Sequence, residues 1–509
     1  MNMKFNINIL VLLLMACSFR AYSQTPLDSL SVMPATAAEA GAEVFGNASA
    51  ADVAKALYGR IAGLNVYQGS GSSADNVCSI SVHGRTPLVL VDGFQRDLSD
   101  LTALEIESVC LLSDAVSSAL YGVRGGNGVV LVTTKRGNAS SLNVDARYAY
   151  GLSTPFRKPE FADAYTYASS VNTALSGDGL APRYSQAELA AFRDGTLPYE
   201  YPDVDWWDET MNDVGHTHSL RLSFDGGGNR FRYYAAMDYY RDRSMLKENV
   251  SDPRYSTKPT DTRLSVRANI DVEITGTTLL KAGLAAKLQE LNGTVYGRNN
   301  IINVIYSTPS AAFPVRTREG VYGGNSIYGE LNPVALLTDK GHVRNMYGTL
   351  LADLSLRQKL DILTEGLALE AQVAFDNIGG MSETSGKTYR YMDASPVILP
   401  DGTLVTTPVY YGVDSQTLGH SQPFERLTMR SSFRAKVDYN RSFGRHEVAA
   451  AAIYDMFSAV INGRNNSRKN QSFIMNAGWS FADRYILNAL VSCSGSSYLP
   501  DGEKYHFYP

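Results

Sequence analysis

The sequence predicts an exported chain with two parts: a small α/β domain, followed by a transmembrane antiparallel β-barrel sheet. Three observations lead to this fold class. The first residues have the layout of a secretory signal peptide. Residues 43–138 mix helical and strand-like patterns. Beyond residue 139, apolar and polar residues alternate with a period of two, as they do in barrel strands.

The N-terminal segment 1–23 is interpreted as the signal peptide. Lys4 precedes an apolar run over residues 9–16, and the small-residue sequence A-Y-S ends the segment. A cut before Cys17, as in a lipoprotein, is a less favoured alternative. The apolar run is too short to span a bilayer, and the mature chain has no run of ~18 apolar residues. The sequence therefore predicts export without a transmembrane helix.

Residues 43–138 are interpreted as a compact α/β unit. The patterns predict a helix over 50–59 and strands near 64–68, 77–83, 87–91 and 129–134. Asp92-Gly93 lies between two apolar runs and is a strong signal for a tight turn, because both residues tolerate positive φ.

A glycine-rich stretch, ALYGVRGGNGVVLVTTKRG over residues 119–137, leads into the last strand of this unit. Ser113 and Asp114 are good N-caps for a helix over 115–121, which Gly122 would end in the left-handed region. A phosphate-binding loop needs a strand, then the glycines, then a helix, and here the helix comes first. We therefore interpret four glycines as structural turns: Gly122, Gly125, Gly126 and Gly128.

The region 139–509 has the features of an outer-membrane barrel. Residues 264–274 and 427–439 alternate strictly, and their polar faces carry full charges such as Arg267, Asp271, Arg434 and Asp438. Tight turns at 275–276 and 442–445 contrast with long connections over 290–342 and 377–425. A soluble sandwich also alternates, but it does not explain charged strand faces or this contrast in loop length. We predict about 12 strands between residues 141 and 495.

No catalytic site, cofactor or metal site is predicted. His216-Thr-His218 has the spacing to hold a metal, but two histidines on one strand face are more often surface residues. Cys78, Cys110 and Cys493 form no C-x-x-C pair; a Cys78–Cys110 bridge is conceivable, and free thiols are favoured. Trp206 and Trp207 are interpreted as a membrane interface or a loop core. The net charge of −5 provides no footprint for nucleic acid.

Several blocks resemble the SusC/RagA branch of the TonB-dependent receptors. The blocks in the first domain are residues 57–66, 79–85, 87–94, 106–122 and 125–137, and those in the barrel region are 205–209, 232–236, 483–488 and 495–497. The resemblance implies a plug domain over 43–138 and the N-terminal part of an outer-membrane barrel over 139–509. The plug arginines Arg124 and Arg136, with Lys135, would find partners among carboxylates of the lumen wall.

The resemblance also implies a function. Such receptors import oligosaccharides or peptides across the outer membrane, with a SusD-like surface lipoprotein as a lid. Energy comes from the inner membrane through TonB with ExbB and ExbD. These proteins are transporters and not enzymes. A plugged outer-membrane receptor or adhesin that binds without transport is the alternative.

Coupling to TonB requires an extended segment near the N-terminus that can add a strand to a partner's sheet edge. Within the segment 24–42, which is expected to be flexible, the candidate for this TonB box is Asp28, Ser29, Leu30, Ser31, Val32, Met33 and Pro34. The apolar residues alternate, and the proline would end the pairing. An ordinary disordered tail is the competing interpretation.

The predicted strand number departs from the family pattern. Barrels of this type have 22 strands around their plug. About 12 strands would enclose a radius of only ~12 Å, too little for a plug of about 100 residues with a radius of gyration near 13 Å. The sequence is therefore expected to represent the N-terminal half of a transporter, through truncation, a frameshift or an incomplete gene.

Overall fold

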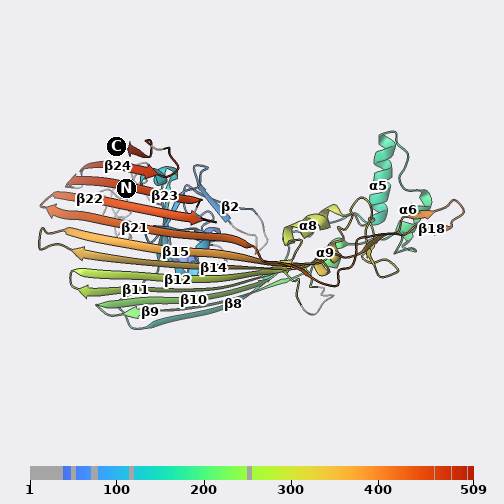
Figure 1. Ribbon diagram of the computed structural model, residues 1–509, viewed down its shortest axis with the longest axis horizontal. Coiled ribbons are helices and arrows are strands. Elements are labelled where there is room, and N and C mark those ends of the chain that lie inside the picture. The colour runs from blue at the N-terminus through green and yellow to red at the C-terminus, as the bar shows by residue number, and fades with distance from the viewer. Residues whose placement is uncertain are drawn as a thin grey trace, which may run out of the picture.

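The computed structural model describes residues 38–46, 53–69, 78–113, 120–248, 255–463, 465–482, 484–500 and 502–508. The predicted signal peptide and the candidate TonB box, residues 28–34, lie outside these ranges. The described chain has three parts: a small α/β domain (the plug), a long antiparallel sheet (the wall) and a helical lobe at one end of the wall strands (the outer lobe) (Figure 1).

The plug is built on a five-stranded sheet. Its strands, in spatial order, are β1 (Ala38–Gly41), β6 (Ile106–Leu112), β7 (Val129–Thr134), β4 (Leu88–Val91) and β5 (Phe94–Gln95). β4 runs parallel to β7, whereas β1–β6, β6–β7 and β4–β5 are antiparallel. A separate antiparallel pair consists of β2 (Leu64–Gln68) and β3 (Cys78–Val82).

Short helices complete the plug and cover its core. They are α2 (Ala42–Gly46), α3 (Val53–Ala56), η2 (Leu98–Asp100), η3 (Ala103–Glu105) and η4 (Gly122–Asn127). Leu57, Val82, Ile106, Val109 and Val130 are completely buried in the core. Because β6 and β7 are apolar on both faces, they can occupy the middle of the sheet with a layer on each side.

Three features of the plug differ from the sequence-based prediction. β1 and part of α2 lie in the segment 24–42 that was expected to be flexible, so the plug starts before residue 43. β1 is rich in alanine and has weak strand propensity, but it pairs with β6 over four residues. β6 was not predicted as a strand at all. The helix expected over 50–59 is described only as α3 and gives way to turns from residue 57.

The wall is a 13-stranded sheet among the described residues, and its long strands follow one another in chain order as antiparallel neighbours. These strands are β8 (Asn143–Ser153), β9 (Gly215–Gly227), β10 (Phe231–Arg243), β11 (Thr260–Thr275), β12 (Thr278–Thr294), β14 (Gly341–Lys359), β15 (Leu367–Gly386), β21 (Phe424–Phe443), β22 (His446–Ile461), β23 (Ser467–Phe481) and β24 (Tyr485–Ser496). Two short strands, β20 (Gly419–Ser421) and β25 (Tyr505–Tyr508), pair with β15 and β24.

The two ends of the wall strands differ as predicted. Tight turns join β11 to β12 and β21 to β22 at one end, where Gly444 has a φ of 63°. The long connections at the other end form the outer lobe, on the right of Figure 1. Its helices are α5 (Ala164–Gly177), α6 (Gln186–Asp194), α7 (Trp206–Thr210), α8 (Arg298–Ser307) and α9 (Pro333–Thr338), and its short strands are β13 (Tyr322–Gly323), β16 (Tyr391–Asp393), β17 (Pro396–Ile398), β18 (Leu404–Thr406) and β19 (Val409–Tyr411).

Both tryptophans of α7 belong to the outer lobe. Trp206 is buried in an apolar cluster with Met211, Leu246 and Ile301, and Trp207 packs against that cluster. The interpretation of these tryptophans as a loop core is therefore correct, and the alternative, a membrane interface, does not apply. The asparagine-, glycine- and tyrosine-rich connections are folded into a lobe with a core of its own.

The wall strands present two different faces. One face carries charged and polar side chains toward the plug (the inner face). The opposite face (the outer face) exposes apolar side chains such as Leu264, Leu284, Leu288, Leu354 and Phe375. A broad exposed apolar surface on a sheet with a polar inner face is the pattern of strands that contact lipid. The predicted fold class, a plug followed by part of an antiparallel barrel, is confirmed.

Two smaller points concern cysteines and helices. Cys78, Cys110 and Cys493 are free thiols, so the conceivable Cys78–Cys110 bridge is not formed. Among the described helices, none is both long and apolar enough to cross a membrane.

Candidate plug–wall interface

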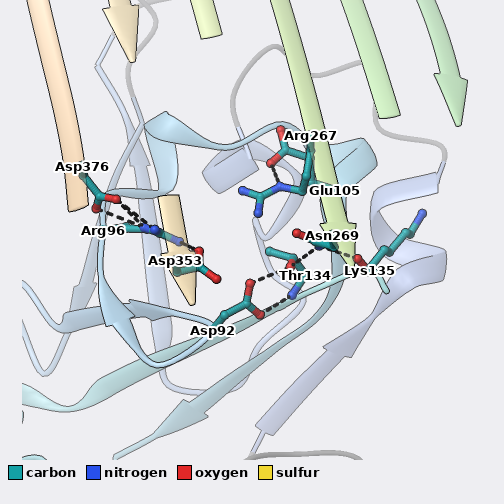
Figure 2. A network of polar contacts seen from close by, with 9 residues as sticks. All are labelled: Asp92, Arg96, Glu105, Thr134, Lys135, Arg267, Asn269, Asp353 and Asp376. Carbon is teal, nitrogen blue, oxygen red and sulfur yellow. Dashed lines mark hydrogen bonds and ion pairs between the residues drawn. The ribbon is translucent and has the colours of Figure 1, made fainter. Parts of the chain in front are cut away.

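The plug rests on the inner face of the wall through ion pairs and hydrogen bonds between residues far apart in the sequence (Figure 2). On the plug side, the contacts come from the segment after the β4–β5 hairpin, from η3 and η4, and from the end of β7. On the wall side, they come from inner-face positions of β11, β14, β15, β21 and β22. This interface is the candidate functional site, because it holds the plug in place.

Arg96 is the central contact. It follows β5 and is only 1% exposed, although it carries a full charge. Its Nη2 donates a hydrogen bond to Asp376 Oδ1 on β15 at 2.9 Å, and its Nη1 donates to Asp353 Oδ1 on β14 at 2.8 Å. Burial opposes the charge on Arg96, but the carboxylates of Asp376 and Asp353 outweigh burial and raise the pKa of the guanidinium.

A second buried pair joins η3 to β11. Arg267 Nε donates to Glu105 Oε2 at 2.5 Å, and both side chains are almost completely buried. Asn269 lies two residues further along the same face of β11 and donates to Thr134 Oγ1 at 3.0 Å and to the Lys135 carbonyl at 2.7 Å. The end of β7 is therefore fastened directly to the wall.

Asp92 extends this network into the plug hairpin. Its carboxylate accepts hydrogen bonds from the Thr134 backbone N–H at 3.0 Å and from the Thr134 hydroxyl at 2.6 Å. Thr134 thus connects Asp92 to Asn269, as Figure 2 shows. These hydrogen bonds fix the β4–β5 hairpin, which leads to Arg96, relative to β7, which contacts Asn269.

Three more sets of ion pairs cross the interface. They are Arg124–Asp455, Arg136–Asp271 at 2.5 Å, and Arg430 with Asp97 at 2.5 Å and Asp100 at 3.4 Å. The signs alternate: plug arginines meet wall aspartates, and plug carboxylates meet wall arginines. The expectation that Arg124 and Arg136 pair with carboxylates of the wall is confirmed. For Lys135, the contact is made by its backbone carbonyl.

Two plug carboxylates have pKa values displaced in opposite directions. Burial would raise the pKa of Asp92, but Arg136, Arg267 and the Thr134 hydrogen bonds outweigh burial and hold this pKa below its usual value. Burial and the neighbouring Asp97 raise the pKa of Asp100, and Arg430 only partly compensates. The interface therefore favours a charged Asp92 and opposes a charged Asp100.

An apolar contact lies beside the ion pairs. Leu112, Leu120, Tyr121 and Val129 of the plug share a buried cluster with three wall side chains on β22 and β23: Ala451, Ile453 and Ile474. Burial raises the pKa of Tyr121 to about 12, so its phenol stays neutral at physiological pH. Leu490 of β24 packs against this cluster, and two further wall side chains, Ala285 of β12 and Leu351 of β14, belong to the buried core of the plug.

The structure places the sequence-predicted turn residues as follows. Asp92 and Gly93 form the β4–β5 turn, with φ of 51° and 91°. Gly122 and Gly128 have φ of 62° and 89°; a Cβ on Gly122 would lie 2.6 Å from Ser494 Oγ, and one on Gly128 would lie 3.1 Å from Val82 Cγ1. Gly125 and Gly126 lie in η4 together with Gly122: Gly125 is buried, and Gly126 is exposed with no heavy atom within 4 Å of an added Cβ.

The TonB box candidate, residues 28–34, lies outside the described residues, so it cannot be placed relative to the turn residues of the plug. The predicted helix over 115–121 lies largely outside them as well. His216 and His218 point to the outer face and contact tyrosines of β8. Among the described residues, no group of three or more His, Cys, Asp or Glu side chains could hold a metal ion.

Sequence reasoning did not single out the plug side of the interface. Arg96, Asp97, Asp100 and Glu105 were not proposed, although all four follow the predicted Asp92-Gly93 turn within 12 positions. A local signal was available. Three charged residues, Arg96, Asp97 and Asp100, follow the two short apolar strands of a domain that is expected to lie inside a barrel. The wall partners Arg267 and Asp271 were recognised as charged residues of a strand face, without their plug partners.

Comparison with known proteins shows similarity to the TonB-dependent receptors. Residues 29–129 match the family model of the TonB-dependent receptor plug domain. TonB-dependent receptors P3 and P26 of Formosa agariphila are 23% and 25% identical over 89% and 90% of this chain. The SusC receptor of Bacteroides thetaiotaomicron is 27% identical over 38% of this chain. The chain spans 44% of P3 and 46% of P26, less than half of either relative.

A solved structure has the same fold. The RagAB peptide transporter superposes with a TM-score of 0.73 at 17% identity, covering 94% of this chain and 57% of that one. The plug domain beside a long antiparallel sheet is the fold that this chain shares with the TonB-dependent receptors it resembles. The similarity extends to SusC and to the RagAB peptide transporter.

Proposed function

We propose that the protein acts in TonB-dependent import of a nutrient across the outer membrane, with the plug as the closed gate. The observation that carries this proposal is the polar seat of the plug: five sets of ion pairs join it to the wall, beside an apolar contact to which the wall contributes six side chains. Charged groups of a polar interface can be rehydrated when the interface opens, whereas a large apolar interface would resist separation at about 25 cal/mol per Å².

The proposed partner on the periplasmic side is TonB, working with ExbB and ExbD. Residues 28–34 are the candidate segment for that contact, because an extended segment can pair with the edge of a partner's sheet. β1 begins four residues after Pro34 and pairs with β6 in the middle of the plug. A pull on the segment would therefore act directly on the plug sheet, with β1 as the first strand to be displaced.

The proposed partner on the outer side is a SusD-like surface lipoprotein that acts as a lid, and the proposed substrates are oligosaccharides or peptides. The similarity to SusC and to the RagAB peptide transporter supports this pairing. The outer lobe offers a tyrosine-rich cavity for such contacts, lined by Tyr167, Tyr184, Tyr201 and Tyr328. Tyrosine suits both sugar stacking and peptide contacts, so the two substrate classes stay open.

The test separates import from binding alone. The receptor is expressed with residues 28–34 deleted, and uptake and surface binding of a candidate substrate are measured in the same cells. Import through TonB predicts that uptake is lost and binding is kept. A matched control deletes residues 35–37, which shortens the same segment without removing the candidate box.

The alternative is a plugged receptor or adhesin that binds without transport. It predicts no energy-dependent uptake in the unmodified receptor, and no effect of either deletion on binding. Uptake that survives the deletion of residues 28–34 would contradict the assignment of the box.

A further inference from the structure

The outer face of β8, β9 and β10 has a basic cluster at one level. In the wall register, Tyr150 lies opposite His218, and His218 lies opposite Arg241. One step further along, His216 lies opposite Arg243. Side chains that are directly opposite in an antiparallel sheet point to the same face, so these residues share the outer face. We call His216, His218, Arg241 and Arg243 the outer basic cluster.

The cluster sits at the edge of the apolar surface. The row just before it consists of Leu220, Tyr239, Leu264 and Leu288, which lie opposite one another across β9, β10, β11 and β12. Beyond that row, the outer face of β11 changes to Thr262 and Thr260. Apolar side chains therefore end, and polar ones begin, at one level across these neighbouring strands.

This level is the boundary with the outer leaflet. The cluster is at the ends of β9 and β10 that lead into the long connections, and in outer-membrane barrels the long connections are extracellular. A lipid headgroup lies at this level when its acyl chains cover the apolar surface. The side chains of the cluster are thus placed at the height of outer-leaflet headgroups.

One carboxylate among the described residues, Glu290, interacts electrostatically with Arg241 of the cluster. Arg243 is exposed, and Arg241 Nε is buried without a hydrogen-bond partner among the described residues. Glu290, two strands away in the Arg241 row, accepts a hydrogen bond from Arg344 at 2.6 Å and is engaged there. Since Glu290 carries one charge and shares it with Arg344, the positive charge of Arg241 and Arg243 is only partly compensated, and both guanidinium groups can attract an anion.

The histidines are held in fixed positions by β8. Tyr148 Oη is 2.9 Å from His218 Nδ1, and Tyr150 Oη is 2.6 Å from His216 Nδ1. When Nδ1 accepts a hydrogen bond from the tyrosine hydroxyl, a neutral imidazole carries its own proton on Nε2, which is a hydrogen-bond donor. Each ring can thus donate outward while its other nitrogen is occupied, an arrangement that does not favour a metal.

We propose that the outer basic cluster binds the phosphorylated headgroup of an outer-leaflet glycolipid, with Arg241 and Arg243 on the phosphate and His216 and His218 as additional donors. Guanidinium groups bind phosphate through paired hydrogen bonds, and the exposed apolar row supplies the surface for acyl chains. The proposal depends on the outer-membrane location and is independent of transport. It assigns this edge of the wall a specific lipid contact.

The test uses the receptor purified in detergent and measures retained lipid by native mass spectrometry. The probe is lipid A with one phosphate, and the comparison probe is the same lipid A without phosphate. Arg243→Gln should weaken binding of the phosphorylated probe roughly fivefold, and Arg241→Gln/Arg243→Gln roughly 25-fold, from the usual contribution of one basic residue near an anionic surface. Lys469→Gln removes an exposed charge from β23 and is the matched control, which should bind as the parent does.

The folded state of every variant is checked by heat-modifiable migration on gels. If the double variant does not fold, the exposed Arg243→Gln variant alone decides the test. The proposal is overturned if the lipid without phosphate binds equally well, or if Arg243→Gln binds as tightly as the Lys469→Gln control. It is also overturned if millimolar inorganic phosphate displaces the lipid completely, because the site would then recognise the free anion, or if the double variant disrupts only self-association of the receptor.

Discussion

Arg96 of the plug and Asp376 of β15 lie 280 residues apart in the chain, and their side chains form a completely buried ion pair with an Nη2–Oδ1 distance of 2.9 Å. Asp353 shares the same guanidinium from the neighbouring strand β14. One cation therefore balances two buried carboxylates. The consequence is an asymmetry: removing the cation should cost more than removing either anion.

The first prediction tests this asymmetry. Asp376→Asn should destabilise the seated plug by about 3 kcal/mol, because Arg96 keeps Asp353 as a partner. Arg96→Met should cost more, about 5 kcal/mol, because two buried carboxylates lose the cation that is hydrogen-bonded to both of them. The measurement is the urea midpoint at which the plug becomes accessible to protease in isolated outer membranes.

The control for this pair is on the surface. Arg193 forms an ion pair with Asp194 in which both side chains are more than half exposed, so Arg193→Gln should change stability by less than about 1 kcal/mol. Equal effects of Arg96→Met and Asp376→Asn would contradict the view of Arg96 as the shared cation.

The second prediction concerns pH. The pKa of Asp92 is lowered in the folded plug, so its stabilising contribution is present above its ordinary pKa of about 3.9 and is lost as pH falls through the lower folded value. The stability difference between the parent and Asp92→Asn should be full at neutral pH and shrink below about pH 4. Chemical denaturation at a series of pH values measures it.

Asp100 provides a control of opposite sign. Its pKa is raised in the folded plug, so its contribution to stability is present at low pH and is lost as pH rises through its ordinary value toward the raised one. Asp100→Asn should therefore gain stability relative to the parent as pH rises above about 4. If the stability of both variants relative to the parent changed in the same direction with pH, the surroundings of one of the two carboxylates would be misassigned.

The third prediction concerns movement of the plug. A Cβ on Gly122 would lie 3.5 Å from the Ser472 Cβ on β23, which is within the usual range for a disulfide. The Gly122→Cys/Ser472→Cys double variant should form a bond that fixes the plug to the wall. If the plug must move for import, uptake should stop under oxidising conditions and return after reduction, with binding unchanged.

The single variant Gly122→Cys is the control, because it carries the strain of a side chain at a φ of 62° without the bond. A cross-linked receptor that still imports would mean that the plug does not leave this part of the wall. Failure of the bond to form in a folded receptor would contradict the close approach of Gly122 to β23.

Local patterns predicted much of the fold, whereas the interface depended on long-range packing. β2 and β7 have the predicted bounds, since short β-branched runs between glycines are local signals. β1 was not predicted, because its alanine-rich sequence becomes a strand only by pairing with β6. The partners of Arg96 could not be predicted, because 257 and 280 residues separate them and the choice depends on how the plug is oriented in the wall.

The last prediction concerns the connection between the plug and the wall. Gly137 lies after β7, and a Cβ there would overlap the backbone of Tyr233 in β10, with its carbonyl carbon at 2.6 Å. The φ of Gly137 is not positive, so the restriction is steric. Gly137→Ala must displace either this connection or β10, at a cost of about 1–3 kcal/mol. Because the neighbouring Arg136 pairs with Asp271, the displacement should also weaken that contact.

Gly126→Ala is the matched control: it adds the same methyl group to an exposed plug glycine with no heavy atom within 4 Å, so its effect should stay within about 0.5 kcal/mol. Thermal midpoints and protease release of the plug measure both variants, and a Gly137→Ala receptor as stable as Gly126→Ala would contradict the close approach of Gly137 to the backbone of β10.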